Sequence, residues 1–164
     1  IMNADGANLR ALTDTTELFS LSGWSGDGQS LLIQTGVRIE FLNVNDGSRS
    51  LLLETQHNPY GSPSAVLSPD GQWLAYLDIV PGRMSPGLFL SRLDGTDKRL
   101  LVQLDYWPVL LPAFSPDGQW LAFSTLNVDL PYPMQATPIL LNIQTCQAIP
   151  LPGLEGEVRQ WLQP

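Results

Sequence analysis

Short apolar runs alternate along the chain with polar turns that carry glycine, and nothing longer than about ten residues shows helical periodicity. The apolar runs are about six residues long, which is typical of β-strands. Many of the turns between them contain Asp-Gly, a pair that favours tight connections between antiparallel strands. The pattern therefore predicts an all-β chain.

A nine-residue phrase marks one kind of turn. SPDGQWLAY occupies residues 68–76, SPDGQWLAF occupies 115–123, and a weaker copy, SGDGQSLLI, occupies 25–33. Proline suits the second position of a type I turn, aspartate the third, and glycine the left-handed conformation that follows. Such a turn joins two antiparallel strands. The predicted turn residues are Asp27, Gly28, Asp70, Gly71, Asp117 and Gly118. Gly26 replaces the proline in the first copy, so we expect a looser turn there.

The phrase recurs about every 45 residues, and four strand-like runs fill each interval. Four antiparallel strands per repeat match the blade of a β-propeller. A β-sandwich would explain the number of strands but not why the phrase repeats in register. The predicted strands are 19–25, 29–35, 37–44 and 48–54 in the first repeat, 64–68, 72–78, 87–93 and 98–104 in the second, and 109–115, 119–125, 138–143 and 146–151 in the third.

Longer stretches around the phrase carry a family resemblance. AVLSPDGQWLAYLDIVPGRMSPGLFLSRLDGTDKRLL and PAFSPDGQWLAF resemble the WD-repeat-like propeller repeat of TolB and its relatives. That repeat also occurs in the propeller domains of prolyl-oligopeptidase-type and tricorn-type proteases. In the third repeat Gln144 and Thr145 replace the Asp-Gly turn. The resemblance implies a β-propeller and an extracytoplasmic, for example periplasmic, location.

The repeats predict a partial propeller of three complete blades with partial blades at both ends. Residues 14–55, 56–104 and 105–152 form the blades. NADGANLRAL aligns with RLDGTDKRLL, so residues 1–13 are expected to end a preceding blade, and residues 153–164 to begin a following one. A propeller ring must close to protect its strand edges. We therefore expect the remaining blades to come from a longer chain or another subunit.

Composition excludes several classes of function. The net charge is −8, and Lys98 is the only lysine, which argues against a nucleic-acid-binding surface. No apolar run reaches the length of about eighteen residues that suggests a membrane span. Cys146 and His57 are each alone, so we expect no cofactor, no metal site and no disulfide within the chain. Cys146 is predicted to lie in an outer strand as a small apolar residue.

The sequence does not indicate a catalytic site. The turn position explains Asp70 and Asp117 without any chemistry. His57 has no accompanying nucleophile motif, because GSPS is not a nucleophile elbow. Trp73 and Trp120 are expected to pack between neighbouring blades.

Long connections of the second and third repeats are predicted to leave one face of the ring, opposite the Asp-Gly turns. Loops longer than the minimum often carry function. The candidate binding residues in these loops are Tyr60, Met84, Tyr106, Trp107, Tyr132 and Met134. Aromatic residues and methionine are enriched at interface cores. The alternative is that these side chains pack under their own loops.

The function predicted is that of a non-catalytic interaction or scaffold module, which binds a protein or peptide through its loop-rich face. The acidic surface would favour basic partner segments. The alternative is a substrate-gating propeller domain of a larger prolyl-oligopeptidase-like serine hydrolase. A third reading is small-molecule binding in the central channel, for which the inner strands offer only the polar Ser22, Ser64 and Ser115.

Overall fold

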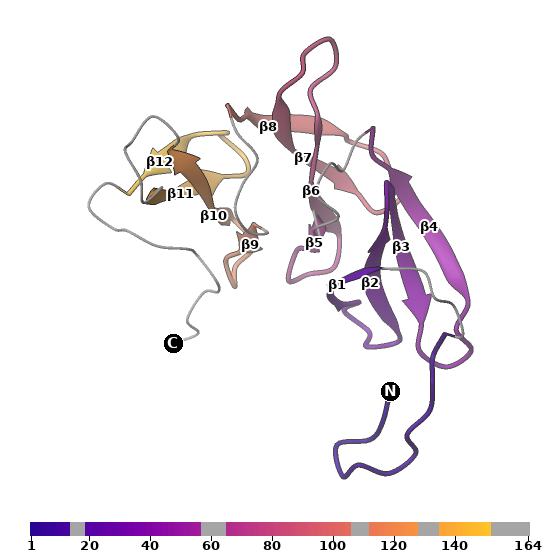
Figure 1. The fold of residues 1–164 in the computed structure, drawn as a ribbon. Helices are drawn as coiled ribbons and strands as arrows, with labels where there is room; N and C mark the ends of the chain where they lie inside the picture. The colour runs from indigo at the N-terminus through magenta and orange to yellow at the C-terminus, as the bar shows by residue number, and fades with distance from the viewer. Residues whose placement is uncertain (14–18, 57–64, 106–111, 128–134, 152–164) are drawn as a thin grey trace.

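Three four-stranded antiparallel sheets make up the fold in the computed structural model, which describes residues 1–13, 19–56, 65–105, 112–127 and 135–151. In each sheet the strands neighbour one another in chain order (Figure 1). The first sheet contains β1 (Ser20–Trp24), β2 (Ser30–Thr35), β3 (Arg38–Asn43) and β4 (Arg49–Glu54); the second β5 (Ala65–Leu67), β6 (Trp73–Ile79), β7 (Pro86–Arg92) and β8 (Arg99–Gln103); the third β9 (Ala113–Phe114), β10 (Trp120–Asn127), β11 (Gln135–Asn142) and β12 (Ala148–Pro150).

The all-β prediction is confirmed, and a strand lies in each of the predicted ranges. Strands β10 and β11 are longer than predicted, because their pairing continues to Asn127 and Gln135. The polar and proline-containing residues at the start of β11 gave no strand signal in the sequence. The innermost strands β1, β5 and β9 lie near one another, and β4, β8 and β12 form the outer edges (Figure 1).

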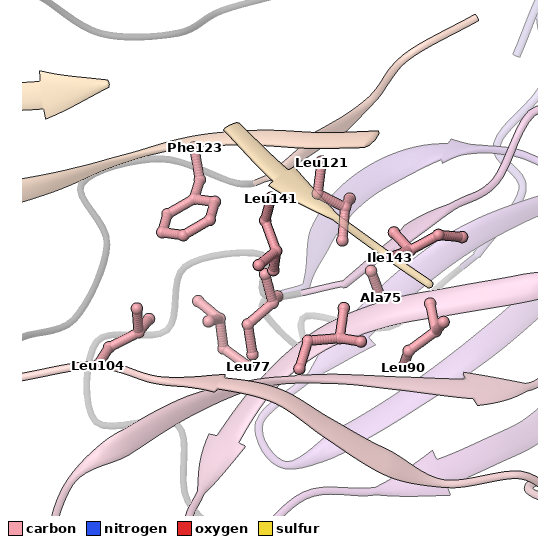
Figure 2. Close-up of a cluster of buried hydrophobic side chains, with 10 residues drawn as sticks. Ala75, Leu77, Leu90, Leu104, Leu121, Phe123, Leu141 and Ile143 are labelled. Carbon is pink, nitrogen blue, oxygen red and sulfur yellow. The ribbon is translucent and has the colours of Figure 1, made fainter. Parts of the chain in front are cut away.

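Alternate residues of the central strands point to opposite neighbouring sheets. In β6, Leu74 and Tyr76 pack toward the first sheet, whereas Ala75 and Leu77 pack toward the third. Figure 2 shows the cluster between the second and third sheets. Its buried members are Ala75, Leu77, Leu88, Leu90, Leu101, Leu104, Leu121, Phe123, Leu141 and Ile143. The cluster between the first and second sheets comprises Leu32, Ile39, Ala65, Leu74, Tyr76, Val80 and Phe89.

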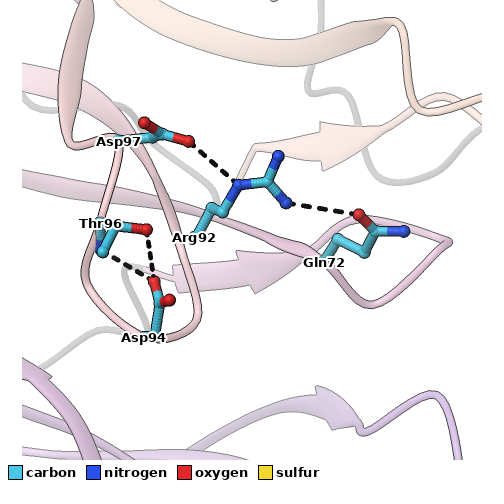
Figure 3. Close-up of polar contacts among 5 residues, drawn as sticks. All are labelled: Gln72, Arg92, Asp94, Thr96 and Asp97. Atoms are coloured by element: carbon cyan, nitrogen blue, oxygen red, sulfur yellow. Dashed lines mark hydrogen bonds and ion pairs between the residues drawn. The ribbon is translucent and has the colours of Figure 1, made fainter.

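Trp73 packs against the cluster between the second and third sheets, which confirms its predicted place between neighbouring repeats. The Arg92 guanidinium lies 4.5 Å from the Trp73 ring centroid, a cation–π contact. Arg92 also donates hydrogen bonds to Asp97 and Gln72, which tie the β7–β8 turn to the β5–β6 turn (Figure 3). Trp120 is half-buried, on the side of β10 that faces away from the second sheet.

The Ser-x-Asp-Gly turns (residues 25–28, 68–71 and 115–118) share one set of hydrogen bonds. The Ser68 hydroxyl donates to Asp70 Oδ1 at 2.5 Å and accepts from the Trp73 amide at 2.9 Å. Asp70 Oδ1 also accepts from the Gln72 amide at 3.0 Å. The glycine that ends each turn has a positive φ, between 67° and 70°. The first turn has the same bonds although Gly26 replaces proline, so the expected loosening is not seen.

These turns lie side by side at one end of the sheets. A Cβ atom placed on Gly71 would lie 3.9 Å from the Gly26 nitrogen, and one on Gly118 would lie 3.7 Å from Pro69 Cδ. The second and third turns therefore each lie against the turn of the preceding sheet. Because the strands are antiparallel and in chain order, the β2–β3, β6–β7 and β10–β11 connections leave from the opposite end.

The prediction that Cys146 lies in an outer strand is wrong. Cys146 is exposed, has a φ of 56° and belongs to the turn before β12. The Asn142 side chain organises this turn by accepting hydrogen bonds from the amides of Gln144 and Thr145. Gly47 holds the equivalent left-handed position in the β3–β4 turn. Without an Asp-Gly signal, the sequence did not reveal that the turn extends to residue 146.

Acid should weaken the Ser-x-Asp-Gly turns. The serine hydroxyl first, and the following glutamine amide second, lower the pKa values of Asp27, Asp70 and Asp117 below their usual value of 3.8. A carboxyl group whose pKa is lower in the folded state stabilises the fold above its unfolded pKa, and this contribution disappears as the pH falls through the folded pKa.

We predict that replacing the three turn serines, Ser25, Ser68 and Ser115, by alanine lowers the urea midpoint at neutral pH. The difference from the unmodified chain should shrink between about pH 5 and about pH 2, because both chains then carry protonated aspartates. Urea titrations at several pH values measure it. A difference that stays constant with pH would contradict the assignment.

Candidate functional site

We call the end of the sheets opposite the Ser-x-Asp-Gly turns the loop face. Its described residues include the Gly36–Val37 turn, the loop 80–85 and the ends of β4 and β8. Of the predicted binding residues, Met84 lies on this face. Tyr60, Tyr106, Trp107, Tyr132 and Met134 lie outside the described residues, as does His57.

The β6–β7 loop carries Met84 on an anchored base. Met84 is 99% exposed, and the loop projects beyond the strand ends (Figure 1). The Val80 amide donates to the Ser85 carbonyl at 3.0 Å, and the Arg83 amide donates to the Val80 carbonyl at 2.9 Å. Val80 itself is buried between the first two sheets. An adaptable apolar side chain is thus held out on a closed loop, where a partner could contact it.

Asp78 fastens the connection between the first and second sheets to the end of β6. Its carboxylate is buried, with 3% of the side chain exposed. Oδ1 accepts hydrogen bonds from the Gln56 amide at 2.7 Å and from the Ile79 amide at 2.8 Å. Gln56 is where the chain leaves the first sheet, so Asp78 fixes the origin of the segment that contains Tyr60.

Lys98 neutralises the buried carboxylate. Its Nζ lies 3.7 Å from Asp78 Oδ2, 5.1 Å from the Phe89 ring centroid and 5.5 Å from that of Tyr76. The two rings stack with their centroids 5.8 Å apart. Burial raises the pKa of the Tyr76 hydroxyl. A buried carboxylate needs such a partner to offset its loss of hydration.

The outer strands close onto the third strands in the same way in all three sheets. In each sheet the amide of the residue that follows the outer strand donates a hydrogen bond of 2.8 to 2.9 Å to a carbonyl at the third strand. The donor and acceptor pairs are Thr55 and Val37, Leu104 and Pro86, and Leu151 and Pro138. These bonds fix the base of the loop face in each repeat. Differences between the repeats therefore lie in the loops above this base.

Charged groups lie at both ends of the sheets. The carboxylates of Asp27, Asp70 and Asp117 lie at the turn end, opposite the loop face. On the loop face, Arg38 pairs with Glu54 at 3.5 Å. Within the residues that the structure describes, no group of three or more His, Cys, Asp and Glu side chains could hold a metal ion.

The sequence did not identify the Asp78–Lys98 pair. The available signals were a single carboxylate near the end of an apolar strand and the only lysine of the chain. Twenty residues of sequence separate them, and only the register of β6, β7 and β8 brings them together. No described part of the chain forms a helix that could cross a lipid bilayer.

Neither protein-family models nor curated proteins match the sequence. Solved structures do match. A protein assigned as TolB from Agrobacterium tumefaciens is 22% identical with a TM-score of 0.69, and TolB from Acinetobacter baumannii is 18% identical with a TM-score of 0.75. The chain has the fold of TolB-type propeller blades.

The match to the two TolB structures covers 92% and 98% of this chain but only 51% and 39% of theirs. The chain thus spans about half or less of their length. The β-propeller domain of the Trilobed protease from Pyrococcus furiosus is also similar, with 14% identity, a TM-score of 0.54, and coverage of 87% of this chain and 44% of that one. The three sheets are consecutive propeller blades, as the sequence predicted.

We predict that Asp78→Ala lowers the free energy of unfolding by about 1–3 kcal/mol, because it leaves the Gln56 and Ile79 amides without their acceptor. Asp78→Asn retains one acceptor oxygen and should lose less. Asp105→Ala, at an exposed position on the same face, is the control and should change little. Urea unfolding measures all three. Equal stabilities of Asp78→Ala and Asp105→Ala would show that Asp78 does not anchor the connection.

Proposed function

We propose that these blades form a non-catalytic interaction module that binds a protein or peptide through the loop face. The observation that carries the proposal is the fully exposed Met84 on a loop whose base is closed by hydrogen bonds. The loops predicted to share this face contribute Tyr60, Tyr106, Trp107, Tyr132 and Met134. Methionine and aromatic side chains together supply large apolar contact area at an interface.

The anchored base of the loop face favours binding. Ordering a surface on binding costs conformational entropy, and a base that is already fixed reduces that loss. Asp78, Lys98 and the closing hydrogen bonds of the outer strands provide such a base. The net charge of −8 would steer basic partner segments toward the propeller.

The similarity to TolB structures supports an interaction module, but one fold can host different functions. The likeness to the propeller domain of the Trilobed protease supports the second candidate, a substrate-gating domain of a larger serine hydrolase. A fluorophosphonate probe distinguishes the two. If the probe labels the natural polypeptide that carries these blades, the gating function is favoured. If the probe does not label that polypeptide, the interaction module is favoured.

We predict that combined alanine substitution of Met84, Tyr106, Trp107 and Tyr132 weakens partner capture about tenfold or more, since buried aromatic anchors dominate interface energies. Capture by the immobilised chain from extracts of its source organism, followed by titration of the captured protein, measures the loss. Gln119→Ala, in an exposed position at the turn end, is the control and should leave capture unchanged. Unchanged capture by the quadruple variant, with an unchanged urea midpoint, would reject the loop face.

A further inference from the structure

One face of the first blade is not covered by another described sheet. We call it the open face. It consists of the exposed Leu21 and Trp24 and of Leu31, Ile33 and Leu42, which are already buried beside them. Strand pairing places them together: Leu21 lies opposite Ile33, and Leu31 lies opposite both Trp24 and Leu42. Leu21 is 54% exposed and Trp24 is 56% exposed. Large apolar side chains in paired strands are rarely left exposed together without a partner.

The equivalent positions of the other two blades are covered. Trp24 is paired with Leu31 as Leu67 is paired with Leu74, and Phe114 with Leu121. Leu67 packs into the cluster between the first and second sheets, and Phe114 into the cluster between the second and third. In the same way, Leu21 corresponds to Ala65, which is fully buried. The face that meets a preceding blade in the second and third repeats is therefore open in the first.

The N-terminal residues repeat the geometry of the β7–β8 turn. The Asn3 amide donates to the Ala7 carbonyl at 2.8 Å, as the Arg92 amide donates to that of Thr96 at 2.9 Å. Asp5 Oδ1 accepts from the Ala7 amide as Asp94 Oδ1 does from the Thr96 amide, both at 2.9 Å. The positive φ angles also agree: 82° and 58° at Gly6 and Asn8, against 81° and 54° at Gly95 and Asp97.

The same residues contact the first blade as β8 contacts the third. The Arg10 guanidinium donates to the Val44 carbonyl, and the Arg99 guanidinium donates to the Ile143 carbonyl. Val44 and Ile143 are equivalent, because their amides donate to the carbonyls of Gln29 and Gln119 in the matching turns.

Leucines two residues after these arginines complete the correspondence. Leu12 packs on Leu31, Ile33 and Leu42, and Leu101 packs in the cluster between the second and third sheets. Residues 1–12 thus occupy the outer-hairpin position of a blade preceding the first.

We propose that the open face is the docking surface for the inner strands of one further propeller blade, whose outer hairpin is residues 1–12. The occupant is a β-sheet of the same repeat, with an apolar face like that formed by Ala75, Leu77, Leu88 and Leu90. This inference rests on the blade geometry and is independent of the proposed partner of the loop face.

A second copy of this chain does not suit the open face. Its third blade would have to bring its own outer strand, β12, to the position that residues 9–12 already occupy. The Leu12 carbonyl oxygen lies close to Gly47: a Cβ atom placed on Gly47 would lie only 2.8 Å from it. This close contact leaves no space for another strand. Only a blade without its outer strand fits.

Charge on this face is already compensated. Glu40 lies opposite Ile33 on the open face and is buried. Its carboxylate oxygens lie 3.6 Å from an Arg38 nitrogen and 3.7 Å from an Arg49 nitrogen. Because this carboxylate is already buried and paired, a covering sheet would remove little further water from it.

The register of the proposed inner strands follows from Ile1. The Ile1 ammonium donates to the Arg10 carbonyl at 2.7 Å, and the Arg10 amide donates to the Ile1 carbonyl at 2.8 Å. Leu90 and Arg99 are paired in the same way, so Ile1 corresponds to Leu90. A copy of residues 65–89 joined directly before Ile1 would complete a blade in register.

The test joins this copy to the full chain and measures how accessible the open face is. Leu21→Cys supplies a thiol where the covered blade has Ala65, and Cys146→Asn removes the natural thiol while suiting its positive φ. We expect the extension to slow iodoacetamide labelling of the introduced thiol about tenfold or more, because a buried thiol reacts only through opening.

The matched control carries one extra glycine at the junction. A shift of one residue turns every side chain of a strand to the opposite face, so this chain should label as fast as the unextended one. As a second readout, Trp24→Lys should lower the thermal midpoint of the in-register chain more than that of the unextended chain.

Equal labelling of the two extended chains, whether both fold or neither does, would overturn the proposal. So would labelling of the unextended chain that slows with rising protein concentration, because a second copy would then cover the face.

Discussion

The packing of one apolar sheet face against the next is the interaction on which this fold depends. Each central strand sends alternate side chains to both sides, as Leu74 and Ala75 do in β6, so both faces of a sheet carry apolar side chains. The Ser-x-Asp-Gly turns assist by aligning the sheets at one end, where Gly71 meets Gly26 and Gly118 meets Pro69. The same packing underlies the proposal that another sheet covers the open face of the first blade.

The two ends of the sheets have different constraints. At the turn end, hydroxyl, carboxylate and amide groups repeat one geometry three times, which leaves little freedom for variation. At the loop face only the base is repeated, and the loops above it differ in length and composition. This division suits an interaction module, because binding residues can vary without disturbing the packing between blades.

Local chemistry explains which features the sequence could predict. The duplicated phrase contains the whole hydrogen-bonded turn, so the hairpins and the blade repeat could be predicted from it. The position of Cys146 could not be predicted, because the turn that contains it is organised by the Asn142 side chain and lacks the Asp-Gly signal. Asp78 and Lys98 meet only through strand register. The hydrogen bond from Arg10 to the Val44 carbonyl can be recognised as part of a blade only by comparison with the bond from Arg99 to the Ile143 carbonyl. The predicted binding residue Met84 is exposed as a loop residue should be, and its role stays a prediction.

A double-mutant cycle across two blades tests the central claim most directly. Leu77 and Leu141 belong to facing sheets and to one buried cluster (Figure 2). Each alanine substitution should cost about 2–5 kcal/mol in unfolding free energy. If the sheets stabilise each other through this cluster, the double variant should depart from additivity by about 0.5–3 kcal/mol. Effects that add to within about 0.3 kcal/mol would contradict the account, since the two leucines would then act independently.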